Sequence, residues 1–243
     1  MNIYAHRGFS GKYPENTILA FKKCLDMDIY GIELDVHRTK DGKIVVIHDE
    51  KVDRTFNGHG FVKDFTLRKL KTLNSSFEGY QSNKECKIPT LEEVLILISP
   101  TDLILNIELK TDKINYPNIE KDVLELILKY NMKNRVLISS FNSNSLKNFH
   151  KLDPSVKTGL LCYLPINNVV NFAKFLGNSY LHPPLVLVNE SLIELCHKNL
   201  LGVNVYTVNE EDDILHCLKL NVDGIFTNYP DIASNLLHSK QYS

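Results

Sequence analysis

The chain has 243 residues, of which 43% are hydrophobic and 23% charged, and its formal net charge is −1. These values are ordinary for a soluble globular protein, and they exclude a strongly nucleic-acid-binding chain or an acidic disordered one. The longest apolar runs, such as 185–188, are far too short to span a bilayer, and the N-terminus lacks the apolar segment of a signal peptide. We therefore expect a cytoplasmic protein without stable membrane insertion.

The cysteines are scattered along the chain and form no CxxC pair. An odd number of scattered cysteines favours free, mostly buried thiols over a disulfide framework, and this fits a reducing compartment. The five are Cys24, Cys86, Cys162, Cys196 and Cys217.

A strand pattern opens the chain at about residues 2–6. Apolar residues at helical spacing follow within 14–28, and Asn16 and Thr17 are the candidates for the helix cap. A strict alternation of apolar and polar residues then predicts a strand at 31–37, and a second apolar run covers 44–47.

Strand and helix patterns alternate from there to the end without a linker. We expect later strands at 103–109, 135–139, 157–163, about 179–182, 202–207 and 223–227. The helical patterns between them cover 90–98, 117–130, 143–151, 166–176, 190–200, 210–219 and 230–238. Such alternation predicts parallel βα units, and eight units in about 250 residues favour a single closed (β/α)8 TIM barrel. An open doubly wound sheet is the alternative.

Residues 49–89 interrupt this regular order as a long insertion after the second strand. An insertion of this length in a compact domain is usually functional, so we expect a lid or binding loop over the site. Within it, residues 51–89 carry 8 basic and 4 acidic residues, which is also what an ordinary solvated surface would show.

Polar residues gather where the strands end, and this is the edge of a barrel that carries active sites. His6 and Arg7 end the first strand, and Glu108 and Lys110 come at the end of the strand at 103–109. On the strand at 31–37, alternation places three polar side chains on one face: Glu33, Asp35 and His37.

A hairpin between 31–37 and 44–47 would bring a second histidine to this face. If Asp41 and Gly42 form a two-residue type I′ turn, the residue numbers of opposed pairs sum to 83. His48 then lies directly opposite Asp35, with the two Cβ atoms about 5 Å apart.

Three clustered carboxylates repel one another and lose hydration when they are buried. A divalent cation held by Glu33, Asp35 and Glu108 would resolve both problems, and all-oxygen ligation favours Mg²⁺ or Ca²⁺. Structural salt bridges from Arg7 and Lys110 are the alternative.

A cation, an arginine and a lysine together suit an anionic substrate, because a guanidinium matches phosphate oxygens bidentately. Two histidines can serve as general acid and general base. The sequence has no GxSxG, P-loop or GxGxxG motif. This combination therefore indicates phosphate-ester cleavage.

Several segments resemble the glycerophosphodiester phosphodiesterases. The similarity is collinear from about residue 3 to 235, and its most specific parts are "HRG" with "PENT" and "ELDV" with "HD". The other matching segments are "VDRTFNGHG" (52–60), "IPTLEEVL" (88–95), "NIELK" (106–110), "SSFN" (139–142), "LHP" (181–183), "VNVYTVN" (203–209) and "DGIFTNYPD" (223–231).

The resemblance implies a TIM barrel that hydrolyses substrates such as glycerophosphocholine or glycerophosphoethanolamine to sn-glycerol 3-phosphate and an alcohol. It implies His6 and His48 as the acid–base pair, a cation on Glu33, Asp35 and Glu108, and Arg7 and Lys110 on the phosphate. Phe141 and Tyr206 would form a wall of the pocket, although the family commonly has Trp where this chain has Tyr206. Within this picture we interpret His37 as a residue that supports a site side chain from behind or simply packs, and Glu15 either orients Arg7 or caps the first helix.

Two other functions stay open at this stage. Lysophospholipase D chemistry on the same barrel would need an apolar channel, for which the candidates are Phe65, Phe77, Phe141 and Leu161. A non-catalytic phosphometabolite sensor is the second alternative. As partners we expect a small-molecule substrate and no nucleic acid, and a homodimer stays open.

Overall fold

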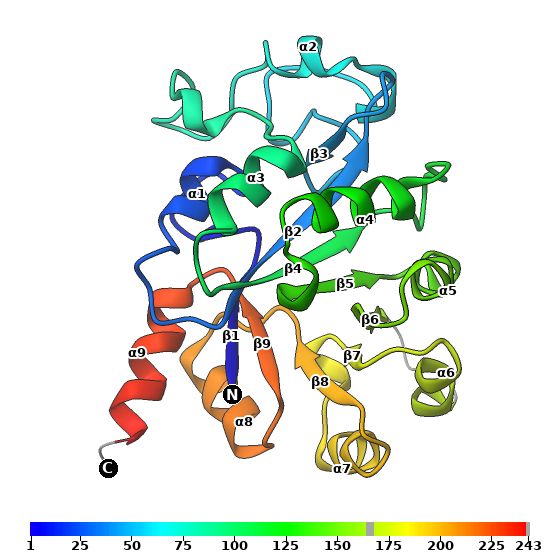
Figure 1. The fold of residues 1–243 in the computed structure, drawn as a ribbon. Helices are drawn as coiled ribbons and strands as arrows, with labels where there is room; N and C mark the ends of the chain where they lie inside the picture. The colour runs from blue at the N-terminus through cyan, green and yellow to red at the C-terminus, as the bar shows by residue number, and fades with distance from the viewer. Residues whose placement is uncertain (164–167, 242–243) are drawn as a thin grey trace.

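The structure is a computed structural model that describes residues 1–163 and 168–241. Within these residues, eight parallel strands form a closed barrel (Figure 1). The barrel closes because β1 pairs with both β2 and β9. The strands are β1 (Asn2–Ala5), β2 (Gly31–Arg38), β4 (Ile104–Leu109), β5 (Val136–Ser140), β6 (Lys157–Leu161), β7 (Tyr180–His182), β8 (Gly202–Val205) and β9 (Gly224–Thr227). The predicted TIM barrel is confirmed, and the open sheet is wrong.

Helices connect the strands and surround the barrel (Figure 1). They are α1 (Ile18–Lys22), α3 (Leu91–Ile98), α4 (Ile119–Lys129), α5 (Ser143–Leu152), α6 (Val169–Phe175), α7 (Glu190–Lys198), α8 (Glu211–Lys219) and α9 (Pro230–Gln241). Short 3₁₀ turns, η3 (Lys133–Arg135) and η4 (Leu185–Leu187), precede β5 and α7. Residues 166–167 of the helix predicted at 166–176 lie outside the described residues. No helix in the described part of the chain is long and apolar enough to cross a membrane.

Strand β2 shows why the alternation at 31–37 has two buried faces. Ile32, Leu34 and Val36 are fully buried in the main hydrophobic core. Glu33 and Asp35, on the opposite face, are also almost completely buried. Because helices cover the outside of a TIM barrel, the apolar face packs against them and the acidic face turns inward.

The hairpin between β2 and β3 (Ile44–Val46) differs from the predicted register by one residue. Val36 lies opposite Val46, and Thr39 N donates to Lys43 O at 2.9 Å. The loop thus has three residues, and it ends on Gly42 in a left-handed conformation (φ +75°), which is typical of three-residue hairpins. Ile47, rather than His48, is bonded across to Asp35, through its N–H to the Asp35 carbonyl at 3.0 Å.

Residues 49–89 connect β3 to α3 and contain three short helical turns: η1 (Val62–Asp64), α2 (Leu67–Leu70) and η2 (Lys84–Cys86). Figure 1 shows this segment, mostly cyan, beyond the C-terminal end of β2. It has a hydrophobic cluster of its own, separate from the barrel core, made of Val45, Ile47, Val52, Phe56, Val62, Leu70, Leu73 and Ile88. Val45 lies in β3 and Ile47 directly follows it, so the insertion packs against the hairpin through this cluster.

Candidate active site

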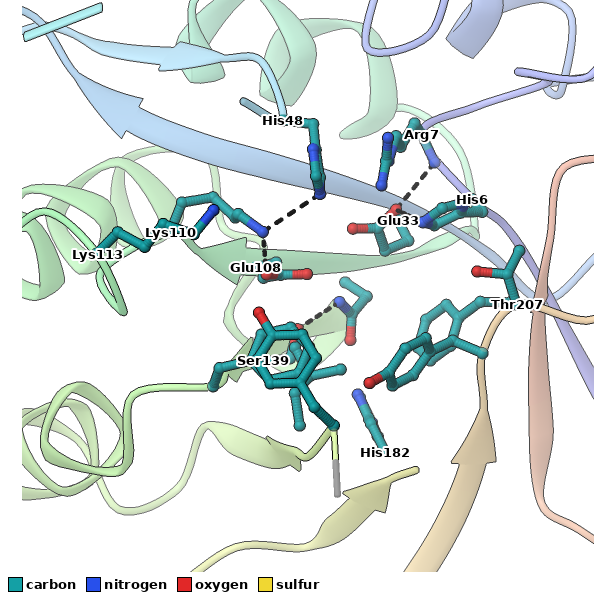
Figure 2. A pocket seen from close by; sticks show the side chains of 16 residues that line it. His6, Arg7, Glu33, His48, Glu108, Lys110, Lys113, Ser139, His182 and Thr207 are labelled. Atoms are coloured by element: carbon teal, nitrogen blue, oxygen red, sulfur yellow. Dashed lines mark hydrogen bonds and ion pairs between the residues drawn. The ribbon is translucent and has the colours of Figure 1, made fainter. Parts of the chain in front are cut away.

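A cavity of about 360 Å³ opens at the C-terminal ends of the barrel strands (Figure 2). Most residues predicted from the sequence for the site line this cavity: His6, Arg7, Glu33, His48, Glu108, Lys110, Phe141 and Tyr206. The strands bring them together from segments that are far apart in the chain.

The three carboxylates form one compact cluster. Glu33, Asp35 and Glu108 each offer an oxygen, and these oxygens all lie within 4.8 Å of one another. Their geometry follows from the sheet register, because Asp35 and Glu108 are directly paired across β2 and β4. All three residues are 9% exposed or less.

The cluster is electrostatically unbalanced. Burial and the charges of Asp35 and Glu108 raise the pKa of Glu33 well above its usual range. Burial also raises the pKa of Glu108, although Lys110 opposes this. Burial would raise the pKa of Asp35 too, but Arg7, His48 and Lys110 outweigh it and hold that pKa well below its usual range.

The cationic side chains of Arg7 and Lys110 both contact the carboxylates, so the predicted salt bridges are present in part. Arg7 Nε lies 3.5 Å from Asp35 Oδ2, and Lys110 Nζ lies 2.8 Å from Glu108 Oε1. Two cations cannot neutralise three carboxylates, and the Oδ1 atom of Asp35 is buried without a hydrogen-bond partner in the described residues. Lys110 Nζ lies 3.9 Å from this oxygen. A carboxylate oxygen without a hydrogen bond in an all-oxygen cluster fits a hard divalent cation such as Mg²⁺ or Ca²⁺.

The turn after β1 places Arg7 against this cluster. Arg7 and Gly8 both have positive φ, 57° and 77°, so the chain reverses sharply there. A Cβ on Gly8 would meet the Ala20 backbone at 2.9 Å, which makes glycine necessary at that position. The turn directs the Arg7 backbone N–H to Glu33 Oε2 at 2.9 Å, while the Arg7 Nη1 reaches Glu15 Oε1 at 3.0 Å. Glu15 therefore contacts Arg7, and the cap of α1 is Thr17.

Both histidines turn Nε2 toward the carboxylates and cations. His6 Nδ1 lies 2.7 Å from Asn228 Oδ1, and His48 Nδ1 lies 2.6 Å from Asp49 Oδ1. Because these oxygens are acceptors, each Nδ1 carries the proton and each Nε2 of a neutral ring is free to accept one. His6 Nε2 is 4.0 Å from Glu33 Oε2, and His48 Nε2 is 3.4 Å from Lys110 Nζ. Burial, together with the nearby Arg7 guanidinium, lowers the pKa of His6 to about 4.

His37 lies behind the cavity and contacts the backbone of His48. Its ring is fully buried, with Nδ1 2.9 Å from Tyr116 Oη and Nε2 3.0 Å from the carbonyl of His48. These contacts hold the chain at His48 after β3 has ended. They explain how His48 reaches the cavity although the ladder register does not place it opposite Asp35.

Aromatic residues form one side of the cavity. Phe141 stacks on Tyr163, with 3.7 Å between ring centroids, and meets the Tyr206 ring edge-on at 6.1 Å. Leu161 also lines this cavity, whereas Phe77 lines a neighbouring one and Phe65 packs beside the cluster of the insertion. The four candidates for an apolar channel therefore do not share one cavity.

Several residues of the site were not anticipated from the sequence. Asn228 and Asp49 orient the two histidines, and Asn16 donates from Nδ2 to Asp35 Oδ2 at 2.9 Å. The signals were weak: Asn228 lies in a polar strand end, Asp49 follows His48 directly, and Asn16 resembles a helix cap. Asn106, Ser139 and His182 also line the cavity with polar atoms.

Known proteins resemble this chain over nearly its full length. The model of the Glycerophosphoryl diester phosphodiesterase family matches residues 6–232. The glycerophosphodiester phosphodiesterase of Caldanaerobacter subterraneus subsp. tengcongensis is 43% identical over 235 residues, 97% of each chain. That of Bacillus altitudinis is 42% identical over 234 residues, 95% of this chain and 96% of the other.

Solved structures give the same result. The glycerophosphodiester phosphodiesterase of Thermotoga maritima is 30% identical with a TM-score of 0.78, and the match covers 98% of this chain and 97% of that one. A phosphodiesterase of Oleispira antarctica, solved in complex with the product sn-glycerol-3-phosphate, is 26% identical with a TM-score of 0.86 and the same coverage.

Proposed function

Because this chain belongs to the glycerophosphoryl diester phosphodiesterase family, we propose that it hydrolyses glycerophosphodiesters by histidine acid–base catalysis with the help of a divalent cation. The products would be sn-glycerol 3-phosphate and a free alcohol such as choline or ethanolamine. The observation that carries this proposal is the convergence of three carboxylates and two histidine Nε2 atoms on one cavity.

Each charged group then has a role in the reaction. Arg7 and Lys110 bind the phosphodiester oxygens and stabilise the charge that develops there. One imidazole Nε2 takes the proton of the nucleophile, either water or the glycerol 2-hydroxyl, as the new P–O bond forms. In the second route, water then opens the cyclic phosphate to give sn-glycerol 3-phosphate. The other donates a proton to the departing alcohol oxygen as the old P–O bond breaks.

Glu33, Asp35 and Glu108 would hold the cation, which would supply further stabilisation of negative charge on the phosphoryl group. Oxygen ligands favour Mg²⁺ or Ca²⁺ over softer metals. The product complex of the Oleispira antarctica enzyme supports sn-glycerol 3-phosphate as the product for this chain as well.

The acid–base roles are tested with His6→Ala and His48→Ala. Each variant is expected to lose about 10²- to 10⁴-fold in kcat for glycerophosphocholine, because general acid–base catalysis contributes that much. The matched control is His59→Ala in the insertion, whose side chain is 91% exposed, and it should keep wild-type activity. A kcat near wild type in either site variant, with circular dichroism showing a native fold in all three proteins, would contradict the assignment.

A further inference from the structure

One arginine of the insertion joins two carboxylates at the edge of the site. Arg54 donates from Nη1 to Glu15 Oε2 at 2.8 Å and from Nη2 to Glu15 Oε1 at 2.7 Å. It also donates from Nε to Asp49 Oδ2 at 2.8 Å and from Nη2 to Asp49 Oδ1 at 3.1 Å. The guanidinium thus holds both acids bidentately.

Each of these carboxylates contacts a second partner that belongs to the site. Asp49 Oδ1 accepts from His48 Nδ1 at 2.6 Å, and Glu15 Oε1 accepts from Arg7 Nη1 at 3.0 Å. A continuous set of bonds therefore runs from His48 through Arg54 to Arg7. The residues between them are Asp49, Arg54 and Glu15. They lie outside the carboxylate cluster and transfer no proton in the reaction proposed above.

We propose that Arg54 is a positioning residue, through which the insertion sets the orientation of both His48 and Arg7. This inference rests on the proposed function, because it assumes that His48 transfers a proton and that Arg7 binds phosphate. A guanidinium is suited to the task, since its planar donors hold two carboxylates in fixed directions. A lysine ammonium carries the same charge without that geometry.

The exposure of Arg54 limits what each of its ion pairs contributes to stability. The Arg54 side chain is 49% exposed, where a single ion pair contributes about 0–1 kcal/mol and more only as part of a bidentate network. Orientation is a different matter. The bond to Asp49 keeps the proton on His48 Nδ1 and so leaves Nε2 as the atom that faces the reaction.

The two ends of the network predict different kinetic effects. Asp49→Asn should lower kcat with little change in KM, because it disturbs the proton-transferring ring. Glu15→Gln should mainly weaken binding, seen as a higher KM and poorer inhibition by sn-glycerol 3-phosphate and inorganic phosphate. Arg54→Gln should produce both effects. We expect a loss of about 10- to 100-fold, the range that is typical when the hydrogen-bond partner orienting a metal-bound histidine is removed.

Three further measurements separate positioning from a general loss of structure. Arg54→Lys keeps the charge and should retain most of the defect. The double variant of Asp49→Asn with Arg54→Gln should lose no more kcat than the worse single variant, since both act through one contact. The His48 Nδ1 proton resonance should shift in Asp49→Asn and Arg54→Gln. Arg68→Gln, exposed on α2 of the same insertion, is the matched control and should change none of these values.

Full activity in Arg54→Lys would show that charge alone is needed, and it would overturn the proposal. The proposal would also be overturned if Arg54→Gln left kcat, product inhibition and the His48 resonance unchanged. In that case an inactive His48→Ala would leave the proposed function standing. Conversely, an active His48→Ala would refute the catalytic role of His48. The His48 resonance would still report whether Arg54 positions the ring.

Discussion

Glu33 illustrates how a single buried residue can oppose folding. It is buried beside two other carboxylates, and its partner is a backbone N–H rather than a cation. Burial and like charges raise its pKa well above the usual range, so the ionised form destabilises the fold unless a positive charge is bound nearby. Its neighbours Asp35 and Glu108 each have such a partner in Arg7 or Lys110.

Glu33→Gln should therefore separate stability from activity. The amide oxygen can still accept from the Arg7 N–H, and the repulsion is removed, so the melting temperature in EDTA should equal or exceed that of the wild type. Activity should fall by more than about 100-fold, because even partners behind a metal ligand are worth 10- to 100-fold. Calorimetry with added Mg²⁺ or Ca²⁺ checks the cause, since the wild type should be stabilised by the cation and the variant much less. A variant less stable than wild type in EDTA would show that Glu33 is a structural residue.

Chelation is the matching test on the unmodified chain. EDTA should abolish glycerophosphocholine hydrolysis, and Mg²⁺ or Ca²⁺ should restore it, because three carboxylates and two fixed cations leave the cluster short of positive charge. The same assay with lysophosphatidylcholine compares the two substrate classes. Full activity after exhaustive chelation would mean that the carboxylates have another purpose.

Among the elements, α3 has the most complete local signal. Its N-cap Thr90 accepts from Glu93 N at 3.1 Å through Oγ1, and the Glu93 carboxylate accepts from Thr90 N at 2.6 Å. This reciprocal capping box follows from Thr at the cap and Glu three residues later.

The hairpin between β2 and β3 is the opposite case. Its Asp-Gly pair suits a two-residue or a three-residue loop, and the sequence pattern does not choose between them.

Thr90→Ala should lower the free energy of unfolding by about 1 kcal/mol, the usual loss for an N-cap oxygen. Because α3 packs on the outside of the barrel, kcat should stay unchanged. Urea denaturation measures the loss, and Thr90→Ser is the control, since it keeps the hydroxyl and should be nearly as stable as wild type. An equal loss in both variants would assign the effect to the threonine methyl group instead.

At the scale of the whole molecule, closure of the barrel encloses polar groups beneath the site. His182 on β7 is fully buried, and a Cβ on Gly159 of the adjacent strand would lie 2.6 Å from its ring. Only glycine permits this close approach. Burial lowers the pKa of His182 from 6.5 to about 3, so the folded protein keeps this imidazole neutral.

This burial predicts a pH dependence of stability. Between about pH 6.5 and pH 3 the unfolded chain binds a proton on residue 182 that the folded chain does not, so stability falls as the pH falls through this range. The contribution is at most about 1.4 kcal/mol per pH unit. His182→Asn should be less stable at pH 7, and its deficit relative to wild type should shrink by that slope toward pH 4 in urea titrations with EDTA. Parallel curves for the two proteins would contradict the prediction.

The sequence by itself determined the order of strands and helices and the faces of β2. Period-2 and period-3.6 patterns are local, and they report which side of an element is buried. They were sufficient to predict the TIM barrel, and they singled out His6, Arg7, Glu33, Asp35, Glu108 and Lys110 as one candidate site. All of these line the cavity except Asp35, which contacts it only through its carboxylate neighbours Glu33 and Glu108.

Only the tertiary structure decided the register of the hairpin and the partners of the two histidines. His6 is bonded to Asn228, which is 222 residues away, and Arg54 reaches Glu15 across the edge of the barrel. A local pattern carries no information about such pairs, because they depend on how loops without periodicity pack against the closed barrel. His48 shows the difference: the pattern placed it near Asp35 by a wrong register, and the contact with His37 after β3 brings it to the cavity.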